Sequence, residues 1–102
     1  MNRVESMIVD KLFAQCRKRG WEFVGAHDGD ERHPGITQGE ATTLLHNLDE
    51  GWLTFIKGTR SVVVYLVFGN DGWDVICDYH LAEGFEEEVM NAVNEYARTF
   101  EE

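Results

Sequence analysis

The chain has 102 residues, a length that fits a single domain spanning residues 1–102, and 43% of them are hydrophobic. A chain of this size buries roughly 60–70% of its unfolded surface when it folds, so this composition supports a packed core and excludes a disordered chain. No apolar run approaches the roughly 20 residues that cross a bilayer, and the N-terminus has no signal-peptide core, so we expect a cytoplasmic protein that does not contact membranes.

The net charge of −10 is unevenly distributed along the chain. Residues 1–20 contain five Lys and Arg against two carboxylates, whereas residues 21–102 contain four against seventeen. An acidic body repels nucleic acid and lipid headgroups and attracts basic protein surfaces. We therefore expect the partner to be a basic surface of another protein rather than nucleic acid. Solubility alone is the alternative explanation of the charge.

The first third of the chain predicts a helix, a strand and a polar loop. Apolar residues recur at helical spacing over residues 3–19, and residues 21–26 favour a short strand. The loop of residues 27–35 contains two histidines and three carboxylates: His27, Asp28, Asp30, Glu31 and His33. Their spacing matches neither a calcium loop nor a zinc site, so we expect no metal and no cofactor.

The rest of the chain predicts a second helix, three strands and a last helix. Thr37 and Glu40 have the spacing of a capping box, which begins a helix that ends near Gly51. Residues 52–57 favour a strand, and a helix runs from residues 82–84 to about residue 100. Between them, β-branched and aromatic runs flank Gly69-Asn70-Asp71-Gly72, which is typical of a hairpin.

These elements define the expected fold class. It is α+β: a three- to four-stranded antiparallel sheet, with the central hairpin at residues 61–81 and helices packed on it. The expected element order is α-β-α-β-β-β-α.

A two-residue turn at Asp71-Gly72 would sort the hairpin side chains onto two faces. The expected core face carries Val64, Leu66, Phe68, Trp73, Val75, Cys77 and Tyr79. The other face carries Val63, Tyr65, Val67, Asp74, Ile76, Asp78 and His80. A three-residue turn would shift the register and exchange the faces of the first strand. Because the second face has an apolar strip, either a second copy of the chain or a helix should cover it.

The sequence gives little support for catalysis. Asp78 and His80 share a strand face, where the carboxylate could orient the imidazole. No Ser, Cys or Thr is placed to act as their nucleophile, and nucleotide-binding and hydrolase motifs are absent from the sequence. We therefore expect no enzymatic activity. Cys16 and Cys77 lie far apart on predicted apolar faces, so buried, reduced thiols are expected.

Short motifs resemble those of small uncharacterised proteins from phages and prophages. They are Gly69-Asn70, the Asp74-Val75-Ile76-x-Asp78-Tyr79 strand, the Asp28-Gly29-Asp30-Glu31 loop and the segment Asp49-Glu50-x-x-Leu53-x-Phe55. The resemblance covers residues 28–80 and implies an accessory protein of a mobile element that acts in the host cytoplasm. It brings no catalytic residues with it.

The leading hypothesis is a small acidic protein that inhibits a host nucleic-acid-binding defence protein, as anti-CRISPR and anti-restriction proteins do. The partner-binding residues are expected to be Asp28, Asp30, Glu31, Tyr65, Asp74, Asp78 and His80. The alternative is a self-associating, non-catalytic module, such as a homodimer, and an enzyme ranks third.

Overall fold

The computed structural model describes residues 1–69, 74–79 and 83–100. The expected turn at Asp71-Gly72, the core residue Trp73 and the candidate site residue His80 lie outside the described residues. The elements in chain order are α1 (Arg3–Lys18), β1 (Glu22–His27), β2 (Arg32–Pro34), α2 (Gln38–Leu45), β3 (Glu50–Lys57), β4 (Arg60–Val67), β5 (Ile76–Tyr79), the π-helix η1 (Glu86–Met90) and α3 (Asn91–Arg98).

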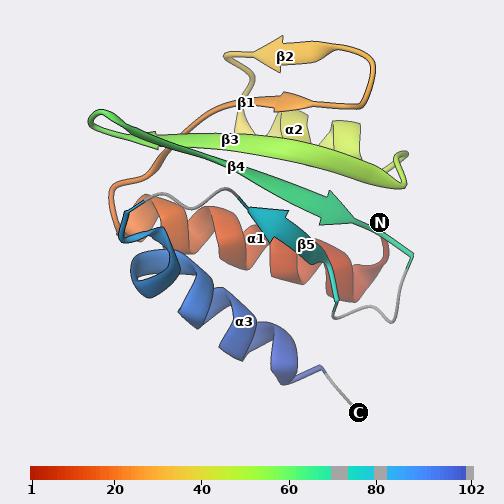
Figure 1. Ribbon diagram of the computed structural model, residues 1–102. Helices are drawn as coiled ribbons and strands as arrows, with labels where there is room; N and C mark the ends of the chain where they lie inside the picture. Colours follow the sequence, from red (N-terminus) through yellow and green to blue (C-terminus); the bar gives the residue numbers. More distant parts are fainter. Residues whose placement is uncertain (70–73, 80–82, 101–102) are drawn as a thin grey trace.

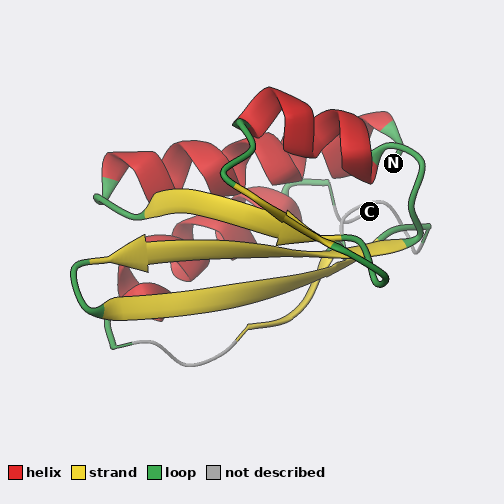
Figure 2. Cartoon of the chain, turned by 90° about the horizontal axis from the view of Figure 1, so that it is seen from above, coloured by secondary structure: helices red, strands yellow, loops and turns green. Residues whose placement is uncertain are grey.

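The strands form one sheet in the order β2-β1-β3-β4-β5, and each neighbouring pair is antiparallel. The helices lie on one face of this sheet, as the view from above shows (Figures 1 and 2). The α+β class is therefore confirmed. The sheet has five strands instead of the expected three or four. The expected element order lacks β2, which lies between β1 and α2.

The missing strand lies in the segment that the sequence predicted to be a polar loop. β2 has only three residues and pairs with β1 through Gly25↔Pro34, Ala26↔His33 and His27↔Arg32. Its three residues are Arg, His and Pro, so the segment lacks the alternation of apolar and polar residues that predicts a strand. Proline is tolerated here because β2 is an outer strand, where an N–H that would face solvent is not needed for pairing.

Helix α1 begins at a capping box that the sequence analysis overlooked. The Asn2 side chain accepts a hydrogen bond from the Glu5 N–H at 2.8 Å, and the Glu5 carboxylate accepts one from the Asn2 N–H at 2.7 Å. The apolar stripe of α1 then packs into the core through Ile8, Val9, Leu12, Phe13 and Cys16, as its spacing predicts. The predicted capping box of α2, between Thr37 and Glu40, is also confirmed.

The Glu5 carboxylate also connects α1 to the segment that follows β4. Its side chain is buried, with 2% of its surface exposed, and its second oxygen accepts a hydrogen bond from the Gly69 N–H at 2.6 Å. Both oxygens therefore have backbone partners, which offsets the cost of burying a polar side chain.

The core lies between the helices and one face of β3 and β4. Phe55 of β3 is at its centre, with the Phe13 ring of α1 at 5.6 Å and the Phe23 ring of β1 at 5.5 Å between centroids. In β4 the side chains alternate as predicted, since Val62, Val64 and Leu66 are buried. The alternative register, which would bury Val63, Tyr65 and Val67, is wrong.

The register of β4 with β5 is confirmed at one end and wrong at the other. The two-residue turn at Asp71-Gly72 predicts the pairs Val64↔Tyr79, Tyr65↔Asp78 and Leu66↔Cys77. The first two are observed, but Leu66 faces Ile76 because a bulge interrupts the ladder. The extra residue turns Ile76 towards the core and leaves Cys77 exposed. The expectations that Cys77 is buried and that Ile76 belongs to the opposite face are therefore wrong.

The C-terminal helical segment is held to the β3–β4 hairpin by Glu88 of η1. The Glu88 carboxylate pairs with Lys57 and accepts a hydrogen bond from Trp21 Nε1 at 3.2 Å, with Arg60 at 3.8 Å. The guanidinium of Arg60 also lies 5.3 Å from the Trp21 ring centroid. Beyond this contact, Phe85, Val89 and Val93 are buried, as their spacing predicts.

We expect Glu5→Gln to lower the free energy of unfolding by about 1–3 kcal/mol, because the amide must place a donor against the N–H of Asn2 or Gly69. Urea denaturation at neutral pH measures this loss. Glu95→Gln, at an exposed position of α3, is the matched control and should change stability little. Equal stability of the two variants would contradict the role of Glu5.

The second prediction concerns pH. The Lys57 ammonium and the Trp21 indole N–H hold the pKa of Glu88 below its ordinary value of 4.5, although burial opposes this shift. A lowered folded-state pKa adds stability above pH 4.5, and this contribution is lost as the pH falls through the folded-state pKa. Glu88→Gln should therefore unfold at lower urea than the wild type at pH 7, and the difference should narrow below pH 4.5. A difference independent of pH would contradict this account.

Candidate functional site

The face of the sheet that points away from the helices is the candidate site. Over residues 1–69, 74–79 and 83–100, neither a helix nor a strand covers this open face (Figure 2). Cross-strand pairing places four side chains in one row across β1, β3, β4 and β5, and neighbours in such a row point to the same face. The row consists of His27, Trp52, Tyr65 and Asp78.

The centre of the row is an aromatic stack. The rings of Trp52 and Tyr65 lie 4.9 Å apart with an interplanar angle of 16°, and the His27 ring meets Trp52 edge-on at 5.6 Å. Trp52 and Tyr65 are both half-buried. Rigid aromatic side chains that remain accessible are the residue types enriched at the centres of protein interfaces.

The hydroxyl group of Tyr65 is bound to an acid. It donates a hydrogen bond to the Glu50 carboxylate, and this bond, together with burial and the negative charge of Glu50, raises the pKa of Tyr65 above 10.0. The contact fixes the orientation of the Tyr65 ring and keeps a carboxylate beside the aromatic stack.

The loop between β1 and β2 is ordered by its own side chains. The Asp28 carboxylate accepts hydrogen bonds from the N–H groups of Asp30 and Glu31, at 2.8 and 2.7 Å, and lies 2.9 Å from His33 Nε2. The pKa of Asp28 is lowered, first by the contact with His33 and then by the two backbone bonds. The Gly29 N–H donates to His27 Nδ1 at 2.9 Å, so the ring hydrogen of His27 is on Nε2.

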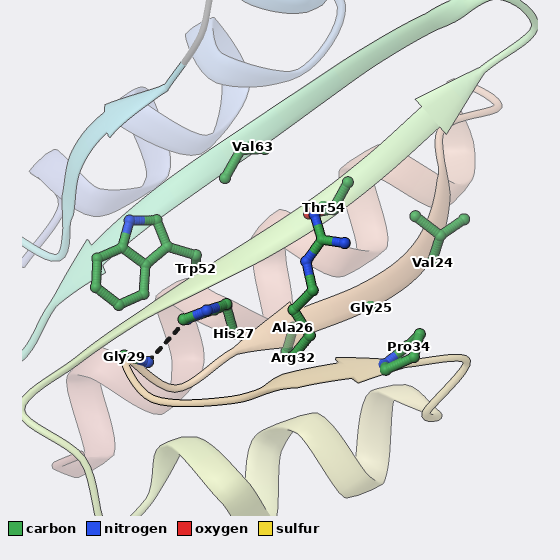
Figure 3. Close-up of a pocket in the computed structure, with 10 residues that line it drawn as sticks. All are labelled: Val24, Gly25, Ala26, His27, Gly29, Arg32, Pro34, Trp52, Thr54 and Val63. Carbon is green, nitrogen blue, oxygen red and sulfur yellow. Dashed lines mark hydrogen bonds between the residues drawn. The ribbon is translucent and has the colours of Figure 1, made fainter.

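A cup opens on this face beside the aromatic stack (Figure 3). Its volume is about 630 Å³. The lining residues come from β1, β2, β3, β4 and the β1–β2 loop, and they are Val24, Gly25, Ala26, His27, Gly29, Arg32, Pro34, Trp52, Thr54 and Val63.

The two ends of the sheet differ in charge. At the end where β1 finishes and β3 begins (Figure 1), the sequence positions of the strands bring together several carboxylates: Asp28, Asp30, Glu31, Asp49, Glu50, Asp74 and Asp78. At the other end, near the β3–β4 hairpin and the end of α1, charges of both signs meet, because the cations Arg17, Lys18, Arg19, Lys57 and Arg60 lie near Glu22, Glu83 and Glu88. The acidic end is the end that borders the aromatic stack.

The structure places the sequence-predicted site residues as follows. Tyr65 and Asp78 are adjacent on the open face, and Asp78 is exposed. Asp30 and Glu31 are exposed at the loop tip, while Asp28 is half-buried and engaged within the loop. Asp74 is exposed just before β5, where it lines a small hollow with Ile8 of α1 and Arg98 of α3, so its expected place on the open face is wrong. Strand spacing puts the β1 and β5 members of the row roughly 14 Å apart, so the loop acids and Asp78 flank the stack from opposite sides.

Three residues of the site were missed by the sequence analysis: His27, Trp52 and Arg32. His27 was considered only as a metal ligand, and Trp52 only as the start of a strand. The alternation of β3 carried a usable signal, because burial of Leu53 and Phe55 requires Trp52 and Thr54 to point to the opposite face. Arg32 could not be placed without knowing that β2 exists.

In the part of the chain that the structure describes, no group of three or more His, Cys, Asp and Glu side chains could hold a metal ion. No helix of that part has the length and apolar character needed to span a membrane.

Comparisons with protein-family models, with curated proteins and with solved structures find no match to this chain.

The geometry predicts how Tyr65 titrates. Because the Glu50 carboxylate stabilises the protonated phenol, Glu50→Gln should lower the pKa of Tyr65 towards 10.0. Absorbance of the phenolate during a pH titration measures this, and subtracting the same titration of Tyr65→Phe isolates the signal of Tyr65. An unchanged pKa in Glu50→Gln would show that the two side chains do not interact in solution.

Proposed function

We propose that the chain is a non-catalytic binding module that docks a basic protein surface on its open sheet face. The observation that carries the proposal is the half-exposed stack of Trp52 and Tyr65, which no helix among the described elements covers. Trp and Tyr side chains that stay half-exposed side by side are typical of the centres of binding surfaces.

Charge supports a basic partner. The stack is bordered by Glu50 and Asp78, and the loop acids Asp30 and Glu31 lie at the same end of the sheet. A Lys or Arg of the partner could pack its charged group over the Trp52 or Tyr65 ring while it pairs with a neighbouring carboxylate. The aromatic pair would supply most of the affinity, and the carboxylates would speed association and select the partner.

A narrower proposal names the partner as a nucleic-acid-binding host defence protein and the chain as a phage accessory protein. Its support is the resemblance of segments within residues 28–80 to phage proteins, together with the acidic charge. A protein that binds nucleic acid has the basic surface that the acidic end would complement.

The test is affinity capture from host lysate followed by variants of the face. Trp52→Ala should lose the captured protein, and so should the triple charge reversal Asp30→Lys, Glu31→Lys and Asp78→Lys. Asp28 is left intact because its carboxylate orders the loop. Capture by the wild type should also weaken at high salt, because exposed charge pairs are screened.

The matched control reverses three exposed acids on the helical side: Asp10, Glu87 and Glu95. It changes the net charge by the same amount and should keep the partner. If both triple variants lose it equally, the acidity acts only through net charge, and the proposal fails.

Sedimentation of the wild type beside Tyr65→Lys examines self-association through the same face. A wild-type dimer that becomes a monomer in Tyr65→Lys would favour the homodimer over the basic partner. A monomer in both cases is the result that the proposal expects.

A further inference from the structure

The cup on the open face is lined by three polar groups that form no ion pair or hydrogen bond with the described residues. Across residues 1–69, 74–79 and 83–100, the ion pairs involve His33, Lys57 and Arg60, and the Arg32 guanidinium joins none of them. His27 Nε2 and the Thr54 hydroxyl group likewise have no hydrogen-bond partner within these residues. All three residues line the same cup.

The shape of the cup depends on the close approach of β2 to β1. A Cβ atom at Gly25 would lie 3.0 Å from the His33 carbonyl oxygen and 3.2 Å from Pro34 Cα, so glycine allows the two strands to lie this close. Arg32 and Pro34 form one wall of the cup, and Trp52, Thr54 and Val63 form the other (Figure 3). The Arg32 side chain extends from β2 across β1 in the direction of Thr54 (Figure 3).

The remaining lining is apolar, and the volume of about 630 Å³ is within the range of sites that bind small molecules. We propose that this cup binds a small, flat aromatic carboxylate, with its ring against Trp52 and its carboxylate at Arg32. The planar guanidinium fork matches a carboxylate, while the His27 Nε2–H and the Thr54 hydroxyl group are further donors.

The surrounding charge favours a monoanion over a dianion. Asp30 and Glu31 lie in the chain between Gly29 and Arg32, which line the cup, so a doubly charged phosphate ester meets more repulsion than a carboxylate. Asp28 is also ionised, but its carboxylate already accepts hydrogen bonds from two backbone N–H groups and contacts His33, so it does not take up the guanidinium of Arg32. The proposal shares Trp52 with the protein-docking surface but does not require that function, because Arg32, and not the carboxylates of the face, holds the charged group of the ligand.

The test uses 2-naphthoate as the probe and 2-naphthamide as its neutral analogue, followed by NMR of the Trp52 indole and of the backbone amides of Ala26 and Thr54. The wild type should shift all three signals and bind the carboxylate roughly tenfold more tightly than the amide, which is the effect expected of one charge-assisted hydrogen bond. 2-Naphthyl phosphate should bind more weakly than 2-naphthoate.

Arg32→Gln should remove the preference for the carboxylate but keep the weak binding of the amide, and Trp52→Ala should weaken both. Arg3→Gln, at an exposed position of α1, is the matched control and should behave as the wild type. The proposal is overturned if 2-naphthoate leaves the Trp52 signal unshifted, or if Arg32→Gln and Arg3→Gln keep the same preference. If the chemical shifts of Arg32→Gln outside the cup match those of the wild type, the variant is folded. A lost preference for the carboxylate then reports a lost site and not a lost fold.

Discussion

One-sided burial is the constraint on which the structure depends. All the helices pack on the same face of the sheet, so Leu53, Phe55 and Val64 must point to that face, and strand alternation sends Trp52, Thr54 and Tyr65 to the other. The open face is thus a direct result of how the core is built. Because Glu5 joins α1 to Gly69 and Glu88 joins η1 to Lys57, the helical layer is fastened to the sheet at both ends.

Local signals predict the regular elements well, whereas irregular pairing escapes them. The stripe of α1, the capping box at Thr37 and the burial of Val64 and Leu66 each follow from spacing along a single element. The bulge in β5 could not be predicted, because it depends on whether Ile76 fits the core better than Cys77 does. β2 escaped because its pairing with β1 is carried by the backbone, with little apolar signal in its three residues.

The candidate site was predictable only in part, for a related reason. Tyr65 and Asp78 were grouped correctly, since their contact depends on the local hairpin register. Trp52 and His27 join them through pairings between strands that are distant in sequence, His27↔Trp52 and Trp52↔Tyr65. An acidic residue in a loop also looks the same in the sequence whether its side chain is exposed, as that of Glu31 is, or hydrogen-bonded within its own turn, as that of Asp28 is.

The lengths of the outer strands have a consequence for aggregation. β3 and β4 have eight residues each and lie in the middle of the sheet, whereas the edges are formed by β2, with three residues and Pro34, and by β5, with four. Short edges interrupted by proline or a bulge are poor templates for another chain to add a strand. The protein can therefore leave one whole face of its sheet available for binding without offering its backbone for edge-to-edge growth into fibrils.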